Sequence, residues 1–147
     1  MNLEQDISSS DIAVIGMSGR FPGAAGLEQF WSNLCQGQEG IRVIADDELI
    51  GHGVDPQVVG ASDYVKAVAD VRGVEFFDNG FFGFTPRDAE IMDPQLRLLL
   101  ECAWSTIEDA GYNVEDYRGA IGVYAGAAPN SYFIENLLPN KELMRAL

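Results

Sequence analysis

The chain has 147 residues, of which 47 % are hydrophobic and 10 % aromatic, a length and composition typical of one folded domain. Nine basic residues against 23 acidic ones give a net charge of −14, which disfavours binding to nucleic acid or to an anionic membrane surface. No apolar run reaches the roughly 18 residues that a membrane-spanning helix needs, and the N-terminus lacks the features of a secretory signal, so we expect a cytoplasmic protein.

The first half of the chain predicts two extended segments with helices between them. Residues 1–10 are polar and serine-rich, which is typical of a flexible leader or linker. Residues 11–16, DIAVIG, form a short apolar run that ends in glycine and predicts a strand buried on both faces. Residues 27–36 carry apolar side chains at helical spacing and predict a helix, and a short helix is expected over 46–50. Residues 63–71 alternate as a strand or hairpin arm does.

The second half contains the clearest helix signals. Residues 76–84 hold five phenylalanines interrupted by glycines, which predicts a compact aromatic loop tucked into a core. The starts at Thr85 and Asp93 each combine a capping residue with proline at the first helical position. After Asp93 the apolar residues recur every three or four positions up to Gly111, so a long helix is predicted.

The last third of the chain repeats the alternation of extended and helical segments. Residues 120–127, AIGVYAGA, predict a second strand buried on both faces, and residues 130–138 and 140–147 look helical. Strands separated by helices indicate an α/β layered fold. The glycines of residues 16–23 follow the first predicted strand. Their spacing matches neither GxGxxG nor the P-loop pattern GxxxxGK followed by serine or threonine, so nucleotide binding is not expected.

The cysteines and the histidine form no visible active site. Cys102 lies in the long predicted helix and has four candidate roles: nucleophile, metal ligand, disulfide partner or core residue. A helix N-terminus or a nearby cation favours a reactive thiolate, whereas Cys102 lies about two turns along the helix and follows Glu101. We therefore interpret Cys102, and Cys35 near the end of the first helix, as buried and unreactive. One histidine, His52, and two distant thiols disfavour a metal site.

Five stretches, read together and in order, resemble one known family. They are DIAVIGMSGRFPGA, FWSNLCQG, DYVKAV, GVEFFDNGFFGFTPRDAEIMDPQLRLLLECAWSTIEDAGY and IGVYAGAAPNSY. Together they are similar to the opening of a modular (type I) polyketide synthase ketosynthase domain, in the beta-ketoacyl synthase family of the thiolase-like superfamily. The resemblance runs from about Asp11 to Tyr132, and its most specific element is MDPQLRLLLECAW, residues 92–104.

The resemblance implies a fold and a reaction. The fold is the N-terminal portion of a thiolase-like layered α/β fold, incomplete in this chain, whose complete domain has two similar halves and is usually a homodimer. The reaction is an acyl transfer, in which a cysteine takes an acyl chain from one acyl carrier protein. Decarboxylative Claisen condensation then joins that chain to a malonyl-type unit on another carrier. The carriers hold these groups on phosphopantetheine, so no cofactor is expected to bind this chain directly.

The resemblance also places the family's catalytic cysteine and two histidines beyond residue 147. We therefore expect residues 11–147 to be a ketosynthase segment truncated before the catalytic cysteine, inactive alone and completed by the remaining part of the domain. Cys102 and His52 occupy other positions and inherit no catalytic role. A non-catalytic remnant, or half of a split ketosynthase that serves as an interaction or dimerisation module, stays an alternative.

One substrate-binding segment is implied in the same way. In related ketosynthases the loop after the second strand approaches the acyl channel near the dimer interface. On this chain that loop carries Pro129, Asn130 and Phe133. An ordinary strand-to-helix turn would explain the same residues without any binding role. The MDPQ motif is interpreted as the cap of a structural helix, with no part in the chemistry.

Overall fold

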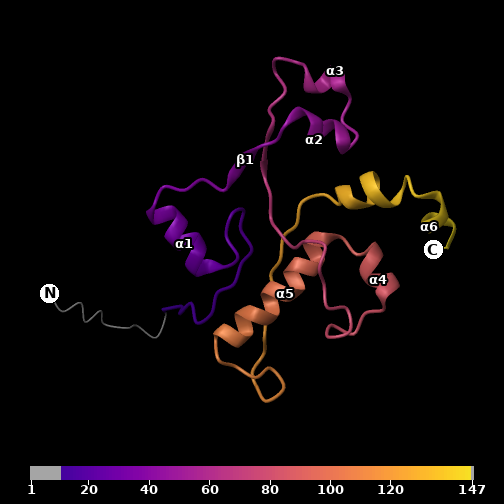
Figure 1. The fold of residues 1–147 in the computed structure, drawn as a ribbon. Coiled ribbons are helices and arrows are strands. Elements are labelled where there is room, and N and C mark those ends of the chain that lie inside the picture. The colour runs from indigo at the N-terminus through magenta and orange to yellow at the C-terminus, as the bar shows by residue number, and fades with distance from the viewer. Residues whose placement is uncertain (1–10, 147) are drawn as a thin grey trace.

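Short helices joined by long irregular segments make up the protein (Figure 1). The computed structural model describes residues 11–146, so the leader predicted over residues 1–10 lies outside them. The elements in chain order are α1 (Leu27–Cys35), β1 (Ile41–Val43), α2 (Asp46–Gly51), α3 (Pro56–Val59), β2 (Ala67–Ala69), α4 (Pro86–Ile91), α5 (Pro94–Asp109), η1 (Phe133–Leu137) and α6 (Lys141–Ala146). Each helix predicted from the sequence is present, and η1 has π-helical geometry.

The predicted caps start the two consecutive helices α4 and α5. Thr85 forms a capping box, because its Oγ1 accepts a hydrogen bond from the backbone N–H of Asp88 while the Asp88 carboxylate accepts one from the Thr85 N–H. Asp93 caps α5, and its Oδ1 accepts a hydrogen bond from the Gln95 N–H at 2.8 Å. The helix ends before Gly111, whose φ of 71° suits glycine. The start and the end of the long helix are therefore as predicted.

Residues 41–70 form a small lobe that stands apart from α5 in Figure 1. β1 pairs antiparallel with β2, with Ile41 opposite Ala69, which confirms the strand predicted within residues 63–71. α2 and α3 contact each other at the far end of the lobe and bury Leu49 and Val59. The lobe thus has a small core of its own.

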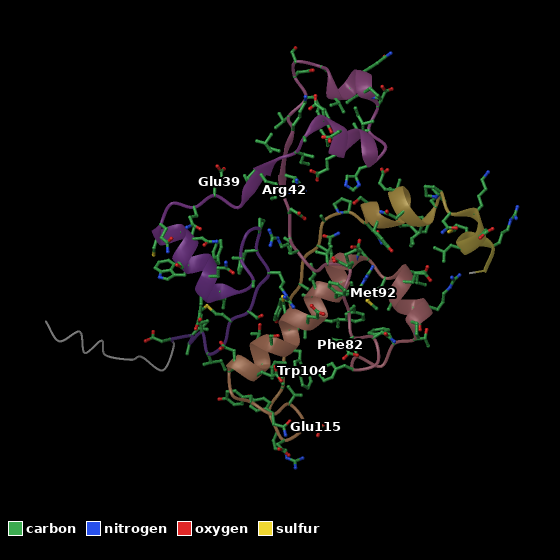
Figure 2. All side chains as sticks on the ribbon, viewed as in Figure 1. Glu39, Arg42, Phe82, Met92, Trp104 and Glu115 are labelled. Carbon is green, nitrogen blue, oxygen red and sulfur yellow. The ribbon has the colours of Figure 1, made fainter. Side chains whose placement is uncertain are left out.

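Ion pairs connect the helices and strands of this lobe. The Arg42 guanidinium (Figure 2) donates two hydrogen bonds to the Glu48 carboxylate, at 2.8 and 3.1 Å, and lies 3.6 Å from the Asp70 carboxylate. Lys66 Nζ lies 2.6 Å from Asp46 Oδ1. The hydrogen bonds from Arg42 lower the pKa of the Glu48 carboxyl group, because they favour its charged form.

The two segments predicted as buried strands are exposed instead. Residues 11–16 and 120–127 have no regular secondary structure, and the side chains of Ile12 and Tyr124 are 95 % and 98 % exposed. The prediction of burial on both faces is therefore wrong for the described structure. Apolar runs of this kind are buried only where neighbouring strands and helices cover them. Within residues 11–146 the sheet consists of β1 and β2 alone, which cover neither segment.

The aromatic loop before α4 packs on α5 without being enclosed. Phe77 and Phe82 stack with ring centroids 5.1 Å apart, and Phe81 meets Trp104 edge-on at 4.8 Å. Phe82 and Trp104 lie together beside α5 in Figure 2. Phe81 is nevertheless 54 % exposed, and Phe76 more so. The predicted loop is confirmed, whereas its expected burial in a core is wrong, because nothing in the described chain covers the outer faces of the rings.

Acidification should loosen the lobe by weakening the contact between Arg42 and Glu48. Because the pKa of Glu48 is lowered in the folded state, its stabilising effect is complete above the unfolded pKa of about 4.3 and is lost as the pH falls through the lower folded value. An NMR titration should show the Arg42 guanidinium signals moving in this range, and Glu48→Gln should reduce the movement, leaving the smaller effect of the Asp70 carboxylate that also faces Arg42. Glu39→Gln removes a nearby exposed carboxylate as a control. A movement of the Arg42 signals that is as large in Glu48→Gln as in the parent would contradict the assignment.

The exposed apolar segments should make the isolated chain self-associate. Residues 11–16 and 120–127 expose apolar side chains and lie outside any sheet, and exposed extended segments of this kind favour edge-to-edge association. We therefore expect sedimentation analysis to show species larger than the monomer and thermal unfolding to lack a sharp transition. A sharp transition from a well-behaved monomer would contradict this expectation, because it would show that the chain forms a buried core by itself.

Candidate functional site

A cavity of about 570 Å³ lies between the N-terminal half of α5 and residues 126–130. Leucines of α5 form its apolar wall, and Arg20, Asp93, Gln95 and Asn130 bring polar groups to it. An apolar wall with a few polar groups is typical of sites that bind small organic molecules or acyl chains. This cavity contains Asn130, one of the residues predicted to bind substrate.

The three predicted substrate-binding residues lie in one short turn. The Oδ1 atom of Asn130 accepts a hydrogen bond of 2.8 Å from the Phe133 N–H, and the Pro129 carbonyl accepts one from the Ser131 N–H. Asn130 lines the cavity, whereas Pro129 and Phe133 are exposed and are not among its lining residues. The structure thus brings the three residues together and places one of them at the cavity. Their substrate-binding role stays a prediction.

The loop that carries these residues is tied to α5 at one point. Residues 120–130 have no regular secondary structure, and in the described part of the chain one hydrogen bond joins them to α5. In that bond the Ala128 N–H donates to Gln95 Oε1 at 3.1 Å. Asp93 holds the other end of the same amide, because Gln95 Nε2 donates to Asp93 Oδ2 at 3.3 Å. The capping role assigned to MDPQ is confirmed, and its link to the loop was missed.

A second contact fixes the chain just after this loop. Arg97 is only 9 % exposed, and its Nε donates a hydrogen bond to the Met92 carbonyl at 3.1 Å. Its guanidinium carbon lies 5.7 Å from the centre of the Tyr132 ring, within the range of a cation–π interaction. The Tyr132 hydroxyl donates to the Glu90 carbonyl at 2.8 Å. The sequence signal for Arg97 was its position among the leucines at the start of the long helix, which alone does not distinguish a buried cation from a solvated one.

The cysteines are less buried than predicted. Cys102 is partly exposed in the wall of the cavity, and Cys35 is exposed at the end of α1. The prediction that both thiols are buried is wrong, because α5 faces a cavity at Cys102 and the described residues leave Cys35 exposed at the end of α1. Arg20, a cation that lines the same cavity, pairs with Glu101 at 3.2 Å. Cys102 also lies inside α5 rather than at its N-terminus, which does not favour a nucleophile.

The remaining candidate groups lie elsewhere or have no partners for catalysis. His52 is exposed at the C-terminal end of α2, in the small lobe. Within residues 11–146 no three histidine, cysteine or acidic side chains are close enough to hold a metal ion. None of the helices in this range is long and apolar enough to cross a membrane.

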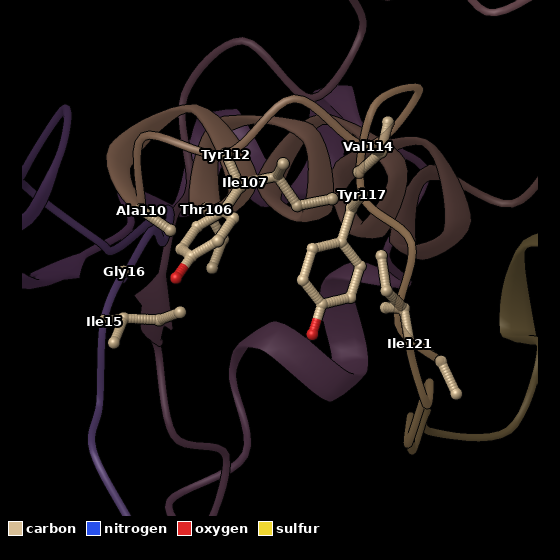
Figure 3. Close-up of a pocket in the computed structure, with 10 residues that line it drawn as sticks. Ile15, Gly16, Thr106, Ile107, Ala110, Tyr112, Val114, Tyr117 and Ile121 are labelled. Carbon is tan, nitrogen blue, oxygen red and sulfur yellow. The ribbon is translucent and has the colours of Figure 1, made fainter.

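A second cavity, of about 310 Å³, lies at the C-terminal half of α5. Figure 3 shows the rings of Tyr112 and Tyr117 beside each other, with Ile15 on one side and Ile121 on the other. Its lining is almost entirely apolar and contains no acid, amine, imidazole or thiol. It lies where the two uncovered apolar segments approach each other, so we interpret it as a gap in the packing rather than as a reactive site.

The two thiols should differ in reactivity. Because Cys35 is exposed and Cys102 only partly so, we expect Cys35 to be alkylated faster by iodoacetamide in the native chain and both at similar rates in denaturant. Peptide mass spectrometry after brief labelling measures this. Replacing Cys102 by serine should cost less than about 1 kcal/mol, because the site is partly solvated. Faster labelling of Cys102 than of Cys35 would contradict this placement.

Comparison with known proteins identifies similar sequences along almost the whole chain. The family model for the beta-ketoacyl synthase N-terminal domain matches residues 9–146. One component of the phenolphthiocerol/phthiocerol polyketide synthase of Mycobacterium tuberculosis is 43 % identical over 136 residues, which are 92 % of this chain and 9 % of that protein. Polyketide synthase PksN of Bacillus subtilis is 43 % identical over 130 residues, which are 88 % of this chain and 2 % of that protein.

Solved structures are similar to the described fold. Ketosynthase twelve of the bacillaene polyketide synthase of Bacillus amyloliquefaciens has a TM-score of 0.62 and 45 % identity, covering 68 % of this chain and 18 % of that one. The ketosynthase from module 1 of the bacillaene synthase of the same species has a TM-score of 0.57 and 49 % identity, covering 68 % and 17 %. These similarities confirm the predicted fold class, an incomplete N-terminal portion of a layered α/β fold. The chain spans less than a fifth of each of these relatives.

Proposed function

The chain belongs to the beta-ketoacyl synthase family, and we propose that it supplies the N-terminal part of a polyketide synthase ketosynthase that forms carbon–carbon bonds by decarboxylative Claisen condensation. The observation that carries this proposal is the similarity to polyketide synthases over 92 % of the chain. The exposed apolar segments support it, because a segment of a larger layered domain leaves such faces to be covered by the rest.

The proposed reaction of the complete domain has two steps. A cysteine thiolate attacks an acyl thioester on one acyl carrier protein, so that the acyl group moves to the cysteine and the carrier's phosphopantetheine thiol is released. A malonyl-type unit on a second carrier then loses carbon dioxide. The resulting carbanion attacks the acyl-cysteine, which forms the β-ketoacyl product and returns the cysteine thiolate. Two histidines assist decarboxylation and stabilise the developing negative charge.

These reactive groups are contributed by the remaining part of the domain in our proposal. Cys35 and Cys102 lie outside any pairing with an imidazole, and the one histidine, His52, belongs to the small lobe. This chain contributes part of the lining of a cavity. α5 and residues 126–130 line the open cavity that contains Asn130, and we propose that this cavity borders the acyl channel, with Pro129 and Phe133 in the adjoining turn. The complete domain would act as a homodimer.

A second function, an interaction module, is favoured by one observation. The apolar segments 11–16 and 120–127 are uncovered, as expected for half of a split ketosynthase that associates with the other half in a separate chain. Association with such a half but no product would support a non-catalytic module, whereas product would support a split enzyme.

The isolated chain should have no condensing activity. With acyl- and malonyl-carrier protein supplied, we expect no β-ketoacyl product above a control without protein, because the chain has no thiol paired with histidines. Mass spectrometry of the carrier-bound products makes the measurement. Product above that control from the isolated chain would contradict the proposal.

Adding the C-terminal remainder of a ketosynthase should restore both folding and activity. We expect a sharp unfolding transition and β-ketoacyl product from the mixture, since the remainder covers the exposed segments and brings the nucleophile. The remainder alone, and the remainder with its catalytic cysteine replaced by alanine, are the controls. A mixture that neither associates nor forms product would count against the split enzyme.

A further inference from the structure

The side chain of Gln95 makes contacts that the cap of α5 does not need. The cap itself consists of the Asp93 carboxylate and the backbone N–H of Gln95, and any residue at position 95 other than proline would provide that N–H. The Gln95 amide makes two further hydrogen bonds, from its Nε2 to Asp93 Oδ2 and to its Oε1 from the N–H of Ala128. The first bond orients the amide so that its oxygen faces Ala128.

The position of Ala128 determines where one wall of the cavity lies. Gly126, Ala127, Ala128 and Asn130 form that wall, and the opposite wall is made by α5, including Cys102. Because residues 120–130 have no secondary structure and one described hydrogen bond to α5, the wall has little else to hold it at this point. The next contact of this part of the chain with its surroundings comes at Tyr132, after the wall has ended.

We infer that Gln95 is a positioning residue that holds residues 126–130 against α5 and thereby sets the width of the cavity for an acyl chain. That the cavity holds an acyl chain rests on the proposed function, whereas the positioning of residues 126–130 by Gln95 does not. The bond between Gln95 and Ala128 is exposed, so water competes for both groups and the preference for the closed position is modest.

The labelling rate of Cys102 reports on this position, because Cys102 is partly exposed and lines the cavity that the loop faces. The test uses the full chain with Cys35→Ser, so that iodoacetamide reports Cys102 alone. Gln95→Met keeps the length of the side chain and removes the acceptor, whereas Gln95→Glu keeps an acceptor oxygen. Gln57→Met is the matched control, since Gln57 is an exposed helical glutamine in the small lobe.

Gln95→Met should speed the labelling of Cys102 by about two- to fivefold, the range expected when one exposed hydrogen bond is lost. Gln57→Met should match the parent, and Gln95→Glu should label at a rate between those of the parent and Gln95→Met, because it keeps an acceptor oxygen but replaces the Nε2 donor to Asp93 with a second carboxylate. Circular dichroism checks that α5 keeps its helix content in each variant. The inference is overturned if Gln95→Met labels like the parent, or if Gln57→Met speeds the labelling as much as Gln95→Met does.

The width of the cavity is tested in the complete ketosynthase domain that contains this segment. Acylation by octanoyl and acetyl thioesters of N-acetylcysteamine is followed in the parent and in Gln95→Met. We expect the KM for the octanoyl thioester to rise about two- to fivefold with kcat unchanged, and the acetyl thioester to be unaffected. Equal KM values for the octanoyl thioester in parent and variant would refute the role in acyl binding. A parent domain that accepts neither thioester would refute the proposed function and leave the labelling result standing.

Discussion

Contacts with α5 hold together segments of the chain that are otherwise loosely connected. The helix is well defined by its own residues, from the Asp93 cap to Gly111, and segments far apart in sequence reach it through single polar or aromatic contacts. At Gly16 the chain comes so close to the helix that a Cβ atom would collide with the Thr106 carbonyl. The other contacts are those of Met17 with Asp109, Arg20 with Glu101, Phe81 with Trp104, Ala128 with Gln95 and Tyr132 with Arg97.

The arrangement around α5 contrasts with that of the small lobe. In the lobe, residues 41–70, the two strands pair with each other and the two helices bury Leu49 and Val59. Local contacts are therefore enough to form its small core. Around α5 the partners are single segments without strand neighbours, and apolar side chains such as Ile12 and Tyr124 stay in water. A parallel or mixed layered sheet needs strands on both sides of each buried strand. The described residues include α5, a helix of such a layered fold, but not the large sheet that would pack against it.

This arrangement explains what a segment of this family can contribute to catalysis. Its thiols and its histidine are dispersed among α1, α5 and the small lobe, so none has the paired base that activates a nucleophile. Its cavity is lined by leucines of α5 and by a loop held through one glutamine. In the proposed ketosynthase the chain therefore shapes the space for the acyl group, while the reactive groups come from the rest of the domain.

Most of the helices, the caps of α4 and α5, the family and the fold class could be predicted from the sequence, because they depend on residues close together in the chain or on motifs such as MDPQLRLLLECAW. The short helix α3 and the strand β1 were not predicted. The turn of Pro129, Asn130 and Phe133 was identified as a unit in the same way. Only the folded chain shows that residues 11–16 and 120–127 are exposed, that Cys102 faces a cavity and that Gln95 reaches Ala128, 33 positions away. Burial and long-range hydrogen bonds depend on which segments meet in space, and the apolar pattern of one segment does not specify its neighbours.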